Sequence, residues 1–232
     1  MKSVDDTTAM SERMQGALQL RRLARRLKER LGVEDIGGEP LEQLVLRYAR
    51  LRPPELRLSL RAYDPAWPQL FAQERTRLLQ ALKDAPVVDI QHVGSTAIPG
   101  LSGKNIIDLA VAVNPPLDAL RYGEVLDALG YRFHGPSPID PGFSWFWRRH
   151  EDGALVIHLC NAGALWFTNL LRSRDYLREH PQEREEYERL KHQLASESGQ
   201  SWLEYSVLKS HLLQQLTARA NAWAEAREGA GS

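Results

Sequence analysis

The chain has 232 residues, its 30 lysines and arginines are balanced by 30 aspartates and glutamates, and 43% of the residues are hydrophobic. A chain of this size and composition can bury a core, in one domain with an appendage or in two small ones, which excludes wholesale disorder. The balanced charge argues against a dedicated nucleic-acid binder with a large basic field, so nucleic acid is an unlikely partner.

The single cysteine, Cys160, excludes an internal disulfide. The first 20 residues carry acidic and hydroxyl side chains where a signal peptide needs a basic start and an apolar run. No stretch of 18 apolar residues is present, so we expect no membrane span and no membrane partner. Together these features favour a reducing cytoplasm.

Residues 1–55 predict a helical N-terminal extension. Between Ser11 and Leu31 the apolar residues recur at steps of three and four, which is helical spacing, and Gly32 suits the end of that helix. A second helix is expected from about Pro40 to Arg50, ending before two consecutive prolines.

The first of these helices has a basic character. Six basic residues occupy the faces left by the apolar ones: Arg21, Arg22, Arg25, Arg26, Lys28 and Arg30. The simpler interpretation is a solvated helix face that forms ion pairs, because residues 1–55 also contain nine acidic residues. The alternative is a surface for nucleic-acid contact or for self-association, so a homo-oligomer remains open.

From residue 56 to about 227 the pattern alternates between strands and helices. The sequence predicts, in chain order, a short strand at 56–60, a helix at 68–83, strands at 87–93 and 105–113, a helix at 117–129, a strand from 131, hairpin arms at 143–149 and 155–160, and helices from 161 to 227 with a break near 198–199. This order indicates an α+β fold, with a small mixed β-sheet flanked by helices.

The segment between the strands at 87–93 and 105–113 carries the most chemistry. A strand leads into Gly94-Ser95-Thr96, where a glycine, free N–H groups and two hydroxyls can bind a phosphate, and Lys104 can add a positive charge. The spacing is not that of a P-loop. An ordinary turn is the simpler alternative.

Asp108 lies inside the apolar strand that follows this turn. A carboxylate beside a phosphate-binding turn suits a divalent cation such as Mg²⁺, which is held by one or two carboxylates together with phosphates and water. A solvent-facing aspartate or a turn cap is the alternative. The two features occur together within 15 residues, which strengthens the case for a phosphate and metal site and leaves both alternatives open.

The run HVGSTAIPGLSGKNIID, from His92 to Asp108, resembles the signature of the GrpB family. That family is similar to the nucleotidyltransferase superfamily with the polymerase-β-like fold. Further matches are YDPAW at 63–67, RDYLR at 174–178 with a proline at 181, and Tyr205 followed by Lys209. The resemblance spans about residues 60–220, which makes 56–227 a GrpB-like nucleotidyltransferase domain and leaves 1–55 outside.

The resemblance implies that Gly94, Ser95 and Thr96 hold the phosphates of a nucleoside triphosphate, and that Asp108 is the metal-binding and catalytic carboxylate for Mg²⁺ or Mn²⁺. The expected reaction transfers a nucleotidyl group to an unknown small-molecule or protein acceptor. The superfamily pairs two acids as D-x-D, but Ala110 stands at the second position here. The alternative is therefore a catalytically weak or inactive nucleotide-binding module that regulates a partner.

The remaining candidates come from their positions and from the same resemblance. His158, on a hairpin strand where the family has histidines, is a candidate ligand or catalytic acid–base group. His92 flanks the turn and either orients it or lines the substrate pocket. Arg174 and Lys209 are candidate phosphate contacts, with an ion pair within its helix as the alternative for Arg174. Trp166 is the candidate surface for stacking a base, with a core or pocket-wall residue as the alternative.

Overall fold

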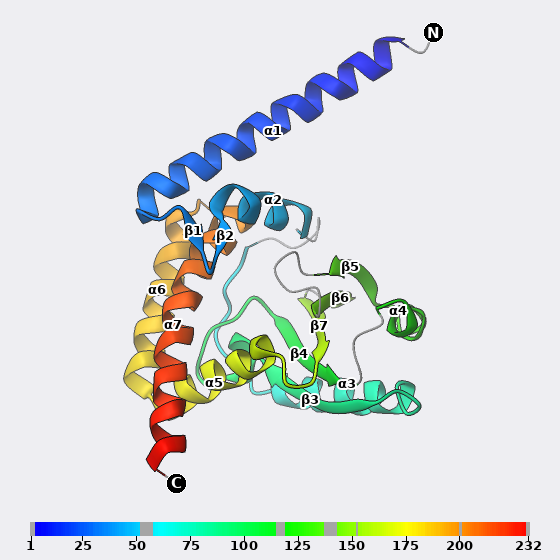
Figure 1. Ribbon diagram of the computed structural model, residues 1–232, viewed down its shortest axis with the longest axis vertical. Coiled ribbons are helices and arrows are strands. Elements are labelled where there is room, and N and C mark those ends of the chain that lie inside the picture. Colours follow the sequence, from blue (N-terminus) through cyan, green and yellow to red (C-terminus); the bar gives the residue numbers. More distant parts are fainter. Residues whose placement is uncertain are drawn as a thin grey trace. The chain divides into compact units, whose positions relative to one another are not determined.

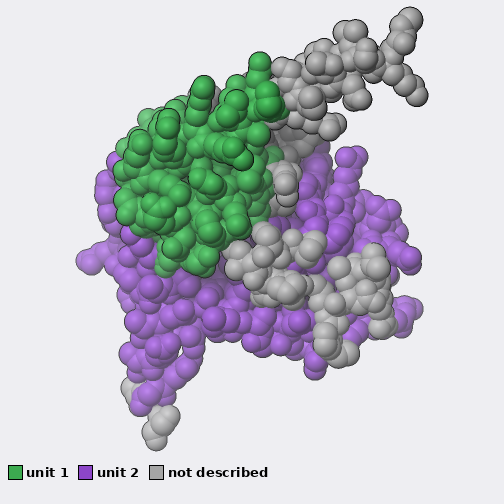
Figure 2. All heavy atoms as spheres, turned by 45° about the horizontal axis from the view of Figure 1, so that its top comes forward, with its two compact units in different colours: residues 1–57, 194–214 green, residues 58–193, 215–232 purple. Residues whose placement is uncertain are grey.

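The computed structural model describes residues 3–51, 58–114, 119–136, 143–151, 153–199 and 201–230. The chain forms two compact units, shown in different colours in Figure 2: residues 1–57 with 194–214, and residues 58–193 with 215–232. The unit that contains the N-terminal helices therefore also takes in a segment near the C-terminus.

The first unit is built around two helices, α1 (Ser3–Leu31) and α2 (Leu41–Leu51), which match the two that the spacing predicts. A hairpin of two-residue strands, β1 (Asp35–Ile36) and β2 (Glu39–Pro40), joins them. The unit's core consists of buried apolar side chains from these elements and from the C-terminal segment: Leu23, Ala24, Leu27, Ile36, Leu41, Leu44, Val45, Val207 and Leu208.

Part of the basic face of α1 is neutralised within the first unit. Three of its six basic residues contact acidic residues there: Arg26 with Glu204, Lys28 with Glu34, and Arg30 with Glu197. These pairs agree with the simpler interpretation of a solvated, ion-paired helix. Exposed pairs of this kind contribute little to stability, about 0–1 kcal/mol each.

The second unit contains a five-stranded mixed sheet (Figure 1). Its strands, in chain order, are β3 (Val87–Val93), β4 (Ile106–Val113), β5 (Arg132–Pro136), β6 (Phe143–His150) and β7 (Gly153–Asn161). They lie side by side in the order β3-β4-β7-β6-β5. Every neighbouring pair is antiparallel except β4 and β7. The predicted small mixed sheet, including the β6–β7 hairpin, is confirmed.

Helices account for most of the remaining residues. They are α3 (Trp67–Ala81), the short 3₁₀ turn η1 (Ser95–Ala97), α4 (Ala119–Ala128), α5 (Leu165–Glu179), α6 (Pro181–Glu197) and α7 (Trp202–Ala230). The prediction of a strand at 56–60 is wrong for its described part, since residues 58–60 are not in a strand and only Arg61 forms an isolated bridge, with Gly103. Residues 56 and 57 lie outside the described part of the chain.

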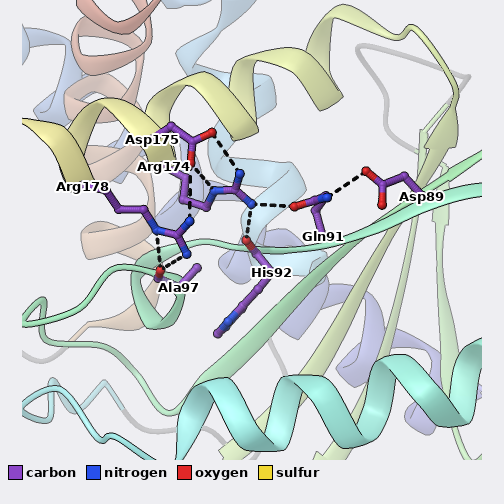
Figure 3. Close-up of polar contacts among 7 residues, drawn as sticks. All are labelled: Asp89, Gln91, His92, Ala97, Arg174, Asp175 and Arg178. Carbon is purple, nitrogen blue, oxygen red and sulfur yellow. Dashed lines mark hydrogen bonds and ion pairs between the residues drawn. The ribbon is translucent and has the colours of Figure 1, made fainter.

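The two faces of the sheet differ in character. One face packs against α3 and α4 through a cluster of buried apolar residues that includes Ile90, Leu109, Val111, Ile157, Leu159 and, from the helices, Leu78 and Leu126. The opposite face carries polar side chains, and α5 lies over it, as Figure 3 shows. Within the described residues, no helix is long and apolar enough to cross a membrane. The polar face holds the candidate site.

Candidate functional site

The turn that follows β3 strongly favours glycine at position 94. Gly94 has a φ of 73° and a ψ of −174°, a backbone conformation that is essentially restricted to glycine. A Cβ atom at this position would lie 2.4 Å from Oδ2 of Asp108. The backbone of the turn therefore comes directly against the carboxylate that the sequence singled out.

Asp108 is held in place by its neighbours on the sheet. It lies on β4 opposite Val93, the last residue of β3. Its Oδ1 is 2.9 Å from Nε2 of His158, which lies on the adjacent strand β7. The Asp108 side chain is 24% exposed, and its Oδ2 accepts no hydrogen bond from the residues that the structure describes. One oxygen is thus bound and the other remains available.

His158 has both of its ring nitrogens engaged. Its Nε2 faces Asp108, and its Nδ1 accepts a hydrogen bond of 2.9 Å from the indole N–H of Trp145 on β6. The imidazole lies near the rings of Phe143 and Trp166, whose centroids are 5.8 and 5.2 Å away. The structure therefore brings His158, Asp108 and the predicted stacking residue Trp166 together.

The turn itself is a short 3₁₀ segment. The N–H of Ala97 bonds to the carbonyl of Gly94 and the N–H of Ile98 to that of Ser95, both at 3.2 Å. The N–H groups of Ser95 and Thr96 begin this segment and have no partner inside it. The hydroxyl of Thr96 donates to the carbonyl of Ile106 at 2.9 Å, so it serves the turn itself.

His92 supports the turn from the α3 side. Its Nε2 is 3.0 Å from Oγ1 of Thr96, and its ring stacks on Phe71 at 4.7 Å and 8°. Burial lowers the pKa of His92 to about 4; Asp108 acts against that shift, while Arg174 and Arg178 add to it. His92 is therefore neutral at physiological pH and donates its Nε2 proton to Thr96.

Two arginines of α5 hold the end of β3 and the turn (Figure 3). Arg174 donates to both oxygens of Asp175, at 2.7 and 2.9 Å, and to the side chain of Gln91 and the carbonyl of His92, at 2.9 and 3.0 Å. Arg178 donates to the carbonyl of Ala97 at 2.6 and 3.1 Å. Burial lowers the pKa of Arg178, with Arg174 adding to the effect. Arg174 is thus tied to the end of β3, with Asp175 as its ion-pair partner, and Arg178 is tied to the turn.

A buried lysine on α6 reaches the same turn, and sequence reasoning assigned it no role. Lys191 is 1% exposed; its ammonium donates to the carbonyl of Ser102 and, at 3.3 Å, to Oγ of Ser95. Glu188 lies 3.6 Å from the same ammonium. Burial acts to raise the pKa of Glu188, but hydrogen bonds from Ser102 and the charge of Lys191 outweigh it and the pKa is lowered. Because lysine side chains are usually exposed, helical spacing offered no signal for Lys191.

The other predicted residues are less closely connected to this centre. Lys104 is partly exposed in the segment between η1 and β4. Lys209 lies on α7 in the other compact unit. Ala110, at the position where a second acid would stand, is fully buried on β4 opposite His158.

The protein groups at this site suit a cation that is held mainly by a bound phosphate and only in part by protein side chains. Among the described residues, no group of three or more histidines, cysteines, aspartates or glutamates is placed to hold a metal ion. Asp108 can contribute Oδ2, and Mg²⁺ commonly completes its shell with phosphate oxygens and water. The residues thus fit Mg²⁺ or Mn²⁺ accompanied by a phosphate ligand, and do not form a cage made of protein groups alone.

A family model and several known proteins match most of this chain. The family model described as "GrpB protein" matches residues 57–219. The chain is 32% identical over 187 residues to a UPF0157 protein of Halalkalibacterium halodurans, covering 79% of this chain and 92% of that protein. It is 31% identical over 155 residues to the glutamate-rich protein GrpB of Alkalihalophilus pseudofirmus, covering 65% of this chain and 88% of that protein.

A solved structure is also similar. The crystal structure of the conserved protein GrpB from Enterococcus faecalis superposes with a TM-score of 0.64 at 27% sequence identity, covering 71% of this chain and 99% of that one. This match confirms the α+β architecture. None of these names states a reaction, so the chemistry has to be argued from the site.

Proposed function

This chain belongs to the GrpB family, and we propose that it is a metal-dependent nucleotidyltransferase that binds a nucleoside triphosphate on the Gly94–Ser95 turn. The observation that carries the proposal is the contact between that turn and Asp108, where a single Cβ atom would come within 2.4 Å of Oδ2. A site for phosphates and a carboxylate for their cation are therefore side by side.

The proposal includes a nucleotidyltransferase-like fold for residues 56–227. Three features support it: β3 and β4 are antiparallel, the turn lies between them, and β7 runs parallel to β4 on its other side. The first strand thus delivers the turn and the second delivers Asp108.

The surroundings of the turn favour an anion. The side chains of Lys191, Arg174 and Arg178 contact the turn or the end of β3, and the two arginines help to lower the pKa of His92. Because Ser95 Oγ accepts from Lys191, its own proton is free to be donated to a phosphate oxygen. The N–H groups at the start of the turn, which have no partner inside the 3₁₀ segment, add to this binding.

Asp108 and the phosphates would together hold Mg²⁺ or Mn²⁺, and the bound cation would neutralise charge on the phosphates during transfer. In that reaction an acceptor oxygen attacks the α-phosphorus, the bond to the bridging oxygen breaks, pyrophosphate leaves, and the acceptor's proton passes to solvent. Trp166, beside His158, is the candidate surface for the base. The acceptor is a small molecule or a protein side chain.

A second candidate function is nucleotide binding without transfer. Ala110 favours it, because the fully buried alanine removes the second acid that would hold the cation firmly. The protein would then act as a sensor that regulates a partner.

Thermal unfolding with each of the four common nucleoside triphosphates, with and without Mg²⁺ or Mn²⁺, tests the proposal. A ligand at a hundred times its dissociation constant stabilises by about 2.7 kcal/mol, which raises the melting temperature by about 6 °C for a chain of this size. We expect a metal-dependent rise that is lost in Asp108→Asn and kept in Asp84→Asn, a control at an exposed carboxylate.

Labelled nucleotide then separates the two candidate functions. Transfer moves the label of an α-labelled triphosphate onto an acceptor, whereas a γ-label leaves as pyrophosphate. Binding without either product supports the sensor. No metal-dependent stabilisation by any of the four nucleotides would refute both.

A further inference from the structure

Three polar side chains form a continuous hydrogen-bonded row across three adjacent strands. Trp145 on β6 lies opposite His158 on β7, and Asp108 lies two residues from the partner of His158 on β4. Both hydrogen bonds in the row measure 2.9 Å. All three residues are on the polar face of the sheet.

The chemistry of the row determines where the imidazole proton lies. An indole N–H can only donate a hydrogen bond, so Nδ1 of His158 must offer its lone pair to Trp145. The proton of the neutral ring is then on Nε2, where it is donated to Oδ1 of Asp108. Trp145 therefore selects one of the two tautomers of His158.

The aromatic residues around His158 keep the ring in this orientation. The ring of Phe143 is nearly parallel to the imidazole, at 13°, and Trp166 lies against both of them. The His158 side chain is only 15% exposed. Neither ring nitrogen of His158 is open to a ligand or to a substrate proton in this arrangement.

We infer that Trp145 and His158 are positioning residues: Trp145 orients His158, and His158 binds Oδ1 of Asp108, so that Oδ2 is the one carboxylate oxygen presented to the Gly94 turn. The inference rests on the proposed function in so far as Oδ2 serves the cation of a bound nucleotide. It assigns His158 an orienting role in place of a ligand or acid–base role. Residues that orient a metal ligand commonly change metal affinity by about 10–100-fold when they are replaced.

The tautomer is tested directly, without any nucleotide, by NMR of the protein with ¹⁵N-labelled histidine at one neutral pH. In the wild type, His158 should show an unprotonated Nδ1 and a protonated Nε2. Trp145→Phe keeps an aromatic ring but removes the donor, and should lose this single-tautomer signature. Trp147→Phe is the matched control, because Trp147 lies on the same strand and contacts His134.

The functional consequence is tested by the affinity for Mn²⁺ with each of the four nucleoside triphosphates. Trp145→Phe should weaken the metal-dependent affinity about tenfold, and Trp147→Phe should leave it unchanged. His158→Gln supplies one acceptor for Trp145 and one donor for Asp108, so it should retain most of the affinity. His158→Leu supplies neither and should lose it.

The outcomes separate this inference from the proposed function. A protonated Nδ1 in the wild type, or a His158→Gln variant that binds as weakly as His158→Leu, overturns the positioning role. If the wild type shows the expected tautomer and binds no nucleotide with metal, the proposed function fails while the assigned row of hydrogen bonds stands.

Discussion

Two carboxylates lie on opposite faces of the same sheet, and they differ in how many of their oxygens accept hydrogen bonds from the protein. Glu74 on α3 accepts from the hydroxyl of Tyr131 at 2.9 Å, from Arg148 at 2.8 Å and from Arg77 at 3.4 Å, and its side chain is 6% exposed. Asp108 accepts from His158 alone among the described residues, and four times as much of its side chain is exposed, 24%.

The difference separates a structural carboxylate from a candidate binding carboxylate. The Oε1 of Glu74 is bound by Tyr131, a residue whose pKa burial and this carboxylate raise well above its usual range. Removing one partner of such a buried charge pair is costly, because the other charge is left without compensation. In Asp108, by contrast, one oxygen accepts no hydrogen bond from the described residues and lies beside the glycine turn, where a ligand can use it.

The largest expected effect comes from replacing Glu74, whose two carboxylate oxygens are both hydrogen-bonded. Glu74→Ala should lower the free energy of unfolding by about 4 kcal/mol, because it leaves the guanidinium of Arg148 without its buried counter-charge. Urea denaturation measures this loss, and Asp84→Ala, at an exposed carboxylate, is the control. Should the Glu74→Ala variant be insoluble, Glu74→Gln, which keeps an acceptor for Tyr131, should lose about 2 kcal/mol. A loss within the error of the Asp84 control would contradict the interpretation of Glu74 as a structural carboxylate.

Acid should lower the free energy of unfolding through His92, which supports the turn. The pKa of His92 is about 4 in the folded chain, against about 6.5 for an ordinary histidine, so the unfolded chain binds a proton that the folded chain does not. The contribution of His92 to stability is full above about pH 6.5 and is lost as the pH falls to about 4, by about 3 kcal/mol.

The measurement is unfolding by urea at a series of pH values, for the wild type and for His92→Gln. Glutamine can still donate to Thr96 but does not titrate, so the variant should lack this part of the pH dependence. Parallel curves for the two proteins would show that His92 binds its proton equally well in the folded and unfolded chain, which would contradict the lowered pKa.

A smaller effect is expected at the turn itself. Gly94→Ala should cost about 2 kcal/mol, because alanine is strained at this backbone conformation and its Cβ would displace Asp108. The control is Gly100→Ala, where φ is also positive, at 84°, but nothing lies within 4 Å of the added carbon. Thermal unfolding should show the control about half as destabilised. Equal losses would mean that the contact with Asp108 carries no energy.

These contrasts also explain what the sequence could predict. The sheet was predictable because its strands are β-rich or apolar runs bounded by turns, and the glycine and the aspartate were visible because both stand in a strand–turn–strand segment of 15 residues. The strand expected at 56–60 shows the limit, since alternation alone gives no pairing partner.

The supporting contacts were not predictable, because they join residues that are far apart in the chain. Trp145 and His158 lie on the two arms of one hairpin, away from its turn, and their hydrogen bond depends on register, which periodicity does not give. The pairing of Lys191 with Ser95 spans 96 positions. The tertiary structure alone brings these groups to the turn.

The smallest expected change in stability distinguishes the two carboxylates most directly. Asp108→Asn and Glu74→Gln make the same chemical change, from a carboxylate to an amide of equal size. Asp108→Asn should change the free energy of unfolding by less than about 1 kcal/mol, because the amide oxygen still accepts the proton of His158 and no buried cation is left unpaired. It should nevertheless abolish metal-dependent stabilisation by nucleotides, whereas Glu74→Gln loses stability and keeps that response. If Asp108→Asn were as destabilising as Glu74→Gln, then Asp108 would be a structural carboxylate, and the open oxygen would no longer argue for a binding site.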